Sequence, residues 1–148
     1  MTEVDAGVVR AGIGSRRAAI IGAAAASTVR IPFIIGWLPG QNPNGALIGY
    51  ITQPMTIQGI IATVETPLLT AGTMSVYKAI GGVPIASGTV LHAGSFNANG
   101  PATTSQTLTV TTAALNAGER IGIVVTNQPN WLSGSASGQI TVFATVNP

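Results

Sequence analysis

The chain of 148 residues contains no cysteine and a single histidine, His92. Without cysteine it forms neither disulfides nor thiolate sites, and its redox compartment cannot be inferred. One histidine excludes a histidine-based metal site and four-ligand zinc chemistry within one chain. The sequence also lacks an Asp-rich calcium loop and the Gly-Lys-Ser/Thr end of a phosphate loop. We therefore expect no metal ion and no cofactor.

Acidic residues are equally scarce, and the chain has only four: Glu3, Asp5, Glu65 and Glu119. Acid–base and hydrolytic catalysis need titratable groups that meet in a pocket. A Ser-His-acid triad would have to combine His92 with Glu65 or Glu119, and no Gly-x-Ser-x-Gly elbow exists. We expect Glu119 to form a solvated pair with its neighbour Arg120, and His92 to lie at the surface or at a subunit contact. The sequence therefore predicts that the protein is not an enzyme.

Charge of either sign is rare, because only 7% of the residues are charged, against about 25% in ordinary globular domains. Such a chain has few means of staying soluble as an isolated monomer. We expect other protein to cover much of its surface; the alternative is an unusually hydroxyl-rich monomer. The net charge of +2 arises within the first thirty residues. These arginines are too sparse for a nucleic-acid patch and suit contact with an acidic protein surface.

Small residues dominate the segment 1–27, which has no sustained amphipathic period. We predict an ordered N-terminal arm, extended or partly helical, that packs on a neighbouring subunit and precedes a domain at 28–148. The alternative is a secretory signal, in which Arg16 and Arg17 precede the apolar run Ala18–Ala26. That run is about half the length that a membrane-spanning helix requires. We therefore favour the arm and expect no membrane partner.

The remaining chain shows strand periodicity, most clearly between Thr104 and Val125. Leu108 and Val110 alternate with threonines, which predicts one apolar and one hydroxylated face. Gly118 then turns the chain into a second alternating strand. Other segments rich in β-branched residues predict further strands at Thr28–Ile35, Ala46–Thr52, Ile57–Glu65, Thr73–Ala79 and Gln139–Val146, and Val83–Val90 is expected to be a weak strand or an extended piece.

Two of these strands have further expectations, and the segments between them are rich in glycine, proline and asparagine. Pro32 places its strand at a sheet edge. The strand Ile57–Glu65 has no clean polar face, which predicts an inner strand covered on both sides. We expect loops at Gly36–Gly45, His92–Thr104 and Asn127–Gly138. Seven or eight short strands without a helix period predict an all-β antiparallel sandwich of the jelly-roll or Greek-key type.

Both tryptophans, Trp37 and Trp131, fall in these loops. A tryptophan beside such a loop can stack on a sugar, fill an interface pocket or cap the core. We expect contacts with a partner at both positions, and core capping is the alternative for each.

Several runs resemble those of a known group of proteins: Gly72–Lys78, Thr107–Val110 and Leu115–Ile123. They look like the small jelly-roll proteins of tailed-phage virions, which include capsid decoration (cement) proteins and head-fibre bases. The Leu-x-x-Gly-acidic segment that ends at Glu119 is also similar to tumour-necrosis-factor and complement-type trimeric jelly rolls, where an aspartate usually stands at this place. The resemblance covers roughly residues 57–146.

This resemblance implies a bacteriophage virion protein on the capsid surface that clamps neighbouring capsid subunits without catalysis. Its implied partners are the major capsid protein and copies of itself, in a homotrimer. We expect the contacts to be made by eight residues of the arm and loops: Val8, Val9, Arg10, Ile13, Arg16, Arg17, Trp37 and Trp131. Two alternatives remain: a receptor- or glycan-binding module of a phage tail or fibre, suggested by the tryptophans, and an exported bacterial surface protein, suggested by Arg16 and Arg17.

Overall fold

The computed structural model describes residues 29–127 and 136–148. These ranges contain no α-helix, and all of their strands belong to one compact unit, Arg30–Asn147. Seven strands have four or more residues: β1 (Arg30–Trp37), β2 (Leu47–Tyr50), β3 (Met55–Thr66), β4 (Thr73–Ile80), β7 (Thr104–Leu108), β9 (Glu119–Asn127) and β10 (Ser137–Val146). The short elements are β5 (Thr89–Val90), β6 (Phe96–Asn97), β8 (Ala114–Leu115) and the 3-10 turn η1 (Ile85–Ser87). The number of longer strands agrees with the sequence-based expectation.

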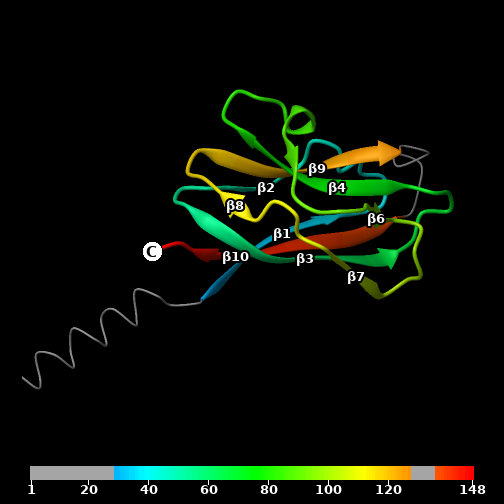
Figure 1. Cartoon of the computed structure of the whole chain (residues 1–148). Coiled ribbons are helices and arrows are strands. Elements are labelled where there is room, and N and C mark those ends of the chain that lie inside the picture. Colours follow the sequence, from blue (N-terminus) through cyan, green and yellow to red (C-terminus); the bar gives the residue numbers. More distant parts are fainter. Residues whose placement is uncertain (1–28, 128–135) are drawn as a thin grey trace, which may run out of the picture. The chain divides into compact units, whose positions relative to one another are not determined.

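The strands form two antiparallel sheets that pack face to face (Figure 1). The first sheet has the order β1-β10-β3-β7, and β8 pairs with β3 beyond the end of β7. The second sheet has the order β2-β9-β4-β5, and β6 pairs with the far end of β4. In Figure 1 the first sheet is the lower layer and the second sheet is the upper layer. The predicted antiparallel β-sandwich is therefore confirmed.

The pairing identifies the sandwich as a jelly roll. When β6 and β8 are set aside, the first strand pairs with the last, the second with the second to last, and so inward: β1·β10, β2·β9, β3·β7 and β4·β5. This is the pattern of one long antiparallel hairpin. The hairpin is rolled up by two further pairings, β10 with β3 and β9 with β4. The jelly roll is a double-sheet fold of this kind with two Greek keys.

Strand β3 is an inner strand, as expected, but the expectation that both of its faces are covered is wrong. It pairs with β10 on one side and with β7 and β8 on the other. The register against β10 shifts between Gly59 and Ile57, so that Gln58 is an extra residue, as in a β-bulge. The bulge lets Ile57 and Ile60 both point into the core although they are three positions apart. Gln58 is exposed and Ile61 is only half-buried.

The expectation of a weak strand or extended piece at Val83–Val90 is mostly wrong, because a 3-10 turn occupies its middle and only Thr89–Val90 is a strand. The chain leaves the second sheet after β4, forms η1, and returns to pair only through β5. Ile85 of η1 is buried and packs on the sheet at Gly122, where a Cβ would lie 3.0 Å from its Cγ atoms. Because Gly122 has no side chain, Ile85 of η1 can pack closely on the outer face of the second sheet.

The core lies between the two sheets and closes where their edge strands β1 and β2 meet. Phe33 of β1 lies against the backbone of Gly49 in β2, since a Cβ at Gly49 would be 2.5 Å from the Phe33 ring. Alternation holds in β9, where Ile121 and Ile123 are completely buried. Leu108 at the end of β7 is buried between exposed threonines, as predicted. The largest completely enclosed side chains include Phe96, Ile51, Ile60, Met74, Leu91 and Leu115.

Candidate functional site

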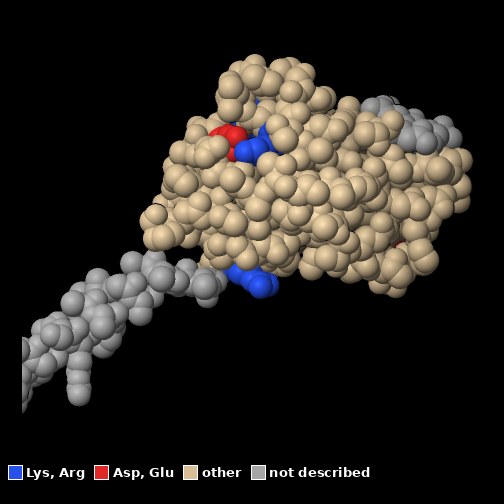
Figure 2. All heavy atoms as spheres, in the orientation of Figure 1, with Lys and Arg blue, Asp and Glu red and all other residues tan. Residues whose placement is uncertain are grey.

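The few charged side chains of the described residues are unevenly placed. There are five: Arg30, Glu65, Lys78, Glu119 and Arg120. Lys78 and Arg120 are only partly exposed and Glu119 is buried, and all three lie at the same end of β4 and β9, whereas Arg30 and Glu65 are exposed on the first sheet. Figure 2 shows red and blue atoms side by side at one place on a face that is otherwise almost free of charge.

Glu119 forms a buried ion pair with Lys78, which corrects the expected solvated pair with Arg120. The Lys78 Nζ lies 3.0 Å from Glu119 Oε1 and also donates to the Ala114 carbonyl at 2.8 Å. Glu119 Oε2 accepts the backbone N–H of Asn116 at 2.6 Å. Successive strand residues point to opposite faces, so Glu119 points inward with Ile121 whereas Arg120 points outward. Sequence adjacency gave the wrong partner because it ignored this alternation.

Arg120 forms hydrogen bonds on the outer side of the second sheet, at the end of β4 and the start of β9. Its Nη2 donates to the carbonyl of Val83 and, at 3.4 Å, to that of Ile80. Ile80 is the last residue of β4, and Val83 lies in the connection from β4 to η1. Together, Arg120 and the Lys78–Glu119 pair hold two segments at the ends of β4 and β9: the stretch with Ala114 and Asn116 before β9, and the connection with Val83 after β4.

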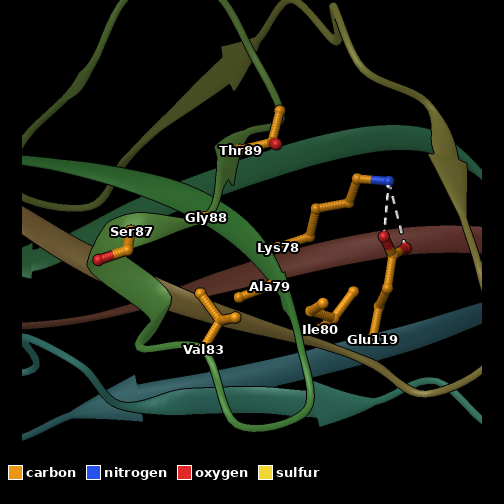
Figure 3. A pocket seen from close by; sticks show the side chains of 8 residues that line it. All are labelled: Lys78, Ala79, Ile80, Val83, Ser87, Gly88, Thr89 and Glu119. Carbon is orange, nitrogen blue, oxygen red and sulfur yellow. Dashed lines mark hydrogen bonds and ion pairs between the residues drawn. The ribbon is translucent and has the colours of Figure 1, made fainter.

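A hollow of about 260 Å³ lies beside this ion pair (Figure 3). Its lining residues are Lys78, Ala79, Ile80, Val83, Ser87, Gly88, Thr89 and Glu119. Ser87 and Thr89 are the hydroxyl-bearing residues of its lining, and its one carboxylate, that of Glu119, is held by Lys78 and by the Asn116 N–H. The Lys78–Glu119 ion pair thus has a structural role beside this hollow. The lining of the hollow contains neither His92 nor an aromatic ring.

The expectation that His92 lies at the surface or at a subunit contact is wrong, because the side chain is 2% exposed. Its Nε2 accepts the backbone N–H of Val76 at 2.9 Å, and its Nδ1 lies 3.2 Å from the carbonyl oxygen of Ala93. These contacts require the neutral imidazole with its proton on Nδ1. Burial lowers the pKa of His92 below its usual 6.5, and hydrogen bonds to the backbone of Ala93 and Gly94 oppose that shift. Of the two acids that a triad with His92 could use, Glu119 pairs with Lys78 and Glu65 is exposed on the first sheet.

The predicted contact residues fall into two groups. Trp37 is the last residue of β1, not the start of a loop, and is 3% exposed. Its ring packs edge to face on Phe96, with 5.8 Å between centroids. This is the core position that was the alternative to a sugar or partner contact. The other seven lie outside the described residues: Val8, Val9, Arg10, Ile13, Arg16, Arg17 and Trp131.

An exposed apolar surface on the first sheet was not predicted. Opposite residues of paired strands point to the same face of a sheet. On the outer face, Ile34 of β1 lies opposite Thr141 of β10, which lies opposite Ile61 of β3. In the next row, Pro32 lies opposite Phe143. We call these five residues the apolar face; Ile34 is 57% exposed and Thr141 is 7% exposed.

Most of the exposed large hydrophobic residues of the sandwich, Ile34 of the apolar face among them, lie in or near β1 and β2. Besides Ile34, large apolar side chains that are more than half exposed occur at Leu38, Leu47 and Tyr50, on β1, β2 and the connection between them. Val29, the residue before β1, is exposed as well, and elsewhere among the described residues only Leu69 and Ile80 are comparable. The sequence does indicate this exposed apolar surface, because Pro32 and Ile34 alternate with the inward-pointing residues of β1. Alternation alone, however, does not show which face of a strand another protein covers.

Within the described ranges, no three or more His, Cys, Asp or Glu side chains are grouped so that they could hold a metal ion. No helix in the part of the chain that the structure describes has the length and apolar character needed to cross a bilayer. Compared with known proteins, the chain matches no family model and no curated protein.

Proposed function

We propose that this protein is a virion structural protein, a decoration (cement) protein that binds the capsid surface and stabilises it without catalysis. The observation that carries the proposal is the surface of the jelly roll. Among the described residues only Arg30 and Glu65 are exposed charges, while the apolar face and hydroxyl-bearing strands remain open to solvent. Exposed apolar patches mark sites of interaction with other proteins. A small, charge-poor sandwich of this kind suits permanent assembly.

In the proposed mechanism the protein only binds. Each copy adds buried area across a seam between capsid subunits, and this resists the outward pressure of the packaged genome. The partners are the major capsid protein and further copies of the chain, in a homotrimer. The segment 1–27 supplies the attachment through its small apolar residues and its arginines Arg10, Arg16 and Arg17, which suit an acidic protein surface.

The test is co-sedimentation of the purified protein with virions of the phage that encodes it. The protein should bind to saturation, and Arg16→Glu with Arg17→Glu should weaken binding at least tenfold, because both substitutions reverse the charge of the arm. Arg30→Glu is the matched control, since Arg30 is an exposed arginine of the sandwich itself. Equal binding of all variants, or no binding of the unmodified protein, would contradict the proposal.

A further inference from the structure

We infer that the apolar face, formed by Pro32, Ile34, Ile61, Thr141 and Phe143, is the surface through which copies of this chain associate. The inference rests on the self-association in the proposed function and names the surface that provides it. It concerns the half of the first sheet that is nearest to β1, on the outer side of the lower layer in Figure 1.

The apolar face is continuous because it follows the register of the sheet. The row Ile34–Thr141–Ile61 crosses three neighbouring strands, and Pro32 and Phe143 form the next row. Gly59 lies opposite Phe143 and brings no side chain to the outer face. Thr141 is almost completely enclosed by its neighbours although it points outward. The result is an uncharged surface without hydrogen-bonding groups other than one shielded hydroxyl.

The other half of the same face has a different chemistry. The row that begins at Ile34 ends at Thr107 on β7, and the adjacent pair is Thr63 with Ser105, whose hydroxyls lie 2.9 Å apart. The outer face therefore carries large apolar side chains only in the half near β1, and hydroxyl groups in the half near β7. Water solvates the hydroxylated β7 half readily, whereas the β1 half gains free energy when another surface covers it.

A second copy fits this surface better than a foreign partner because of charge. None of the five residues of the apolar face is charged, so a second copy can cover this face with its own without burying an unpaired ion. Arg30, opposite Thr145 on the same side of the sheet, lies at its border. An acidic shell protein would instead be recognised through basic residues, and the apolar face has none.

The length of chain outside the described sandwich supports the same occupant. Residues 1–28 precede β1 directly, so an association through β1 brings together the points from which the arms of neighbouring copies start. Arms that start close together bind a repetitive shell as one multivalent unit, and linked binding events strengthen each other by effective concentration. The apolar face would thus turn weak single arms into a stable attachment.

The experiment is sedimentation velocity of the full chain over a range of concentrations. The unmodified protein should be oligomeric, and Ile34→Arg should raise the concentration for half-dissociation at least about tenfold. Ile34 is more than half exposed, so the substitution leaves the core intact. Thr107→Arg, in the same row at the other edge, is the matched control and should leave the oligomer unchanged. Ile34→Thr is the second variant, for the case that Ile34→Arg does not fold. It keeps the β-branched shape but removes apolar surface, and it should also weaken association.

The outcomes separate this inference from the proposed function. If Ile34→Arg and Ile34→Thr both associate like the unmodified protein, the apolar face is not the interface, while self-association and capsid binding stand. If Thr107→Arg dissociates the oligomer as well, the assignment to the β1 half is wrong. If Ile34→Arg remains oligomeric but no longer binds virions, the shell covers this face. A monomeric unmodified protein would overturn both the inference and the proposed homotrimer.

Discussion

The imidazole of His92 fills a gap in the hydrogen bonding of the second sheet. Strand β4 pairs with β5 at Tyr77 and Lys78 and with β6 at Thr73 and Met74. Val76 lies between these two partners, and its N–H finds the His92 Nε2 in place of a strand carbonyl. An unpaired buried N–H is costly. His92 is therefore part of the sheet, and it can fill this role only when Nε2 carries no proton.

Acid should weaken the fold through this residue. Because the folded pKa of His92 lies below the ordinary 6.5, the unfolded chain binds the proton more readily. The stability that the neutral ring contributes is complete above about pH 6.5 and is lost as the pH falls through the folded pKa, by at most about 1.4 kcal/mol per pH unit. Urea unfolding of the untagged protein between pH 7 and pH 5 should show this decline, and His92→Gln should abolish it.

Proton NMR checks the same prediction independently. His92 is the only histidine of the chain, so its ring signals need no assignment. The ring should stay neutral below pH 6.5 in the folded protein. A ring that titrates at or above 6.5, or a His92→Gln variant with the same pH dependence as the unmodified protein, would contradict the role given to the buried imidazole.

Single residues were the hardest features to predict from the sequence. The burial of His92, Glu119 and Trp37 depends on neighbours that are distant in the chain: Val76 for the imidazole, Lys78 for the carboxylate and Phe96 for the indole. Nothing in the local sequence distinguishes such a polar residue from a solvated one. In contrast, Leu108 was placed correctly, and Ile121 and Ile123 follow the alternation expected of the strand after Gly118, because burial there depends only on strict alternation along one strand.

At the scale of elements, the two sheets are joined at one side by the contact of β1 with β2. This contact depends on glycine, because Phe33 occupies the space that a side chain at Gly49 would need. The edge strands of a sandwich expose unpaired backbone groups. Close packing of an aromatic ring on the neighbouring edge strand covers part of β2 and fixes the distance between the sheets at this side.

Gly49→Ala should therefore destabilise the fold, by about 1–3 kcal/mol, as overpacking of a filled site does. A Cβ at Gly49 would lie 2.5 Å from Phe33 Cδ1, whereas a Cβ at Gly59 would meet nothing within 4 Å. Gly59→Ala is thus the matched control and should change the free energy of unfolding by less than about 0.5 kcal/mol. Chemical denaturation measures both variants. Equal effects of the two substitutions would show that Phe33 does not depend on Gly49.

Most long strands could be predicted from β-branched content and alternation, and their boundaries could not. β1 continues through Trp37 because the whole segment pairs with β10, as far as Gly138. The extra residue in β3 follows from its register with β10, and these two strands are separated by about half of the chain. The short strands β5, β6 and β8 have two residues each and exist only because a longer strand lies beside them. Such elements have no local pattern for a sequence to reveal.

At the scale of the whole molecule, the surface divides by chemistry. The described sandwich provides an uncharged apolar face and one structural ion pair, while the excess positive charge lies near the N-terminus. In the proposed assembly these two regions have separate tasks, because apolar contacts join the copies and arginines of residues 1–27 reach the shell. The two kinds of contact respond differently to salt.

Raising the salt concentration should release the protein from virions before it dissociates the oligomer. The Debye length falls from about 10 Å at 0.1 M to about 3 Å at 1 M ionic strength, which weakens the contacts of Arg10, Arg16 and Arg17 with an acidic surface. Association through the apolar face buries no charge and should persist, since the hydrophobic effect does not depend on this screening. Co-sedimentation with virions and sedimentation velocity of the free protein, each measured across this range, give the two midpoints. An oligomer that dissociates at lower salt than the virion complex would mean that charged contacts join the copies, and the division of tasks would be wrong.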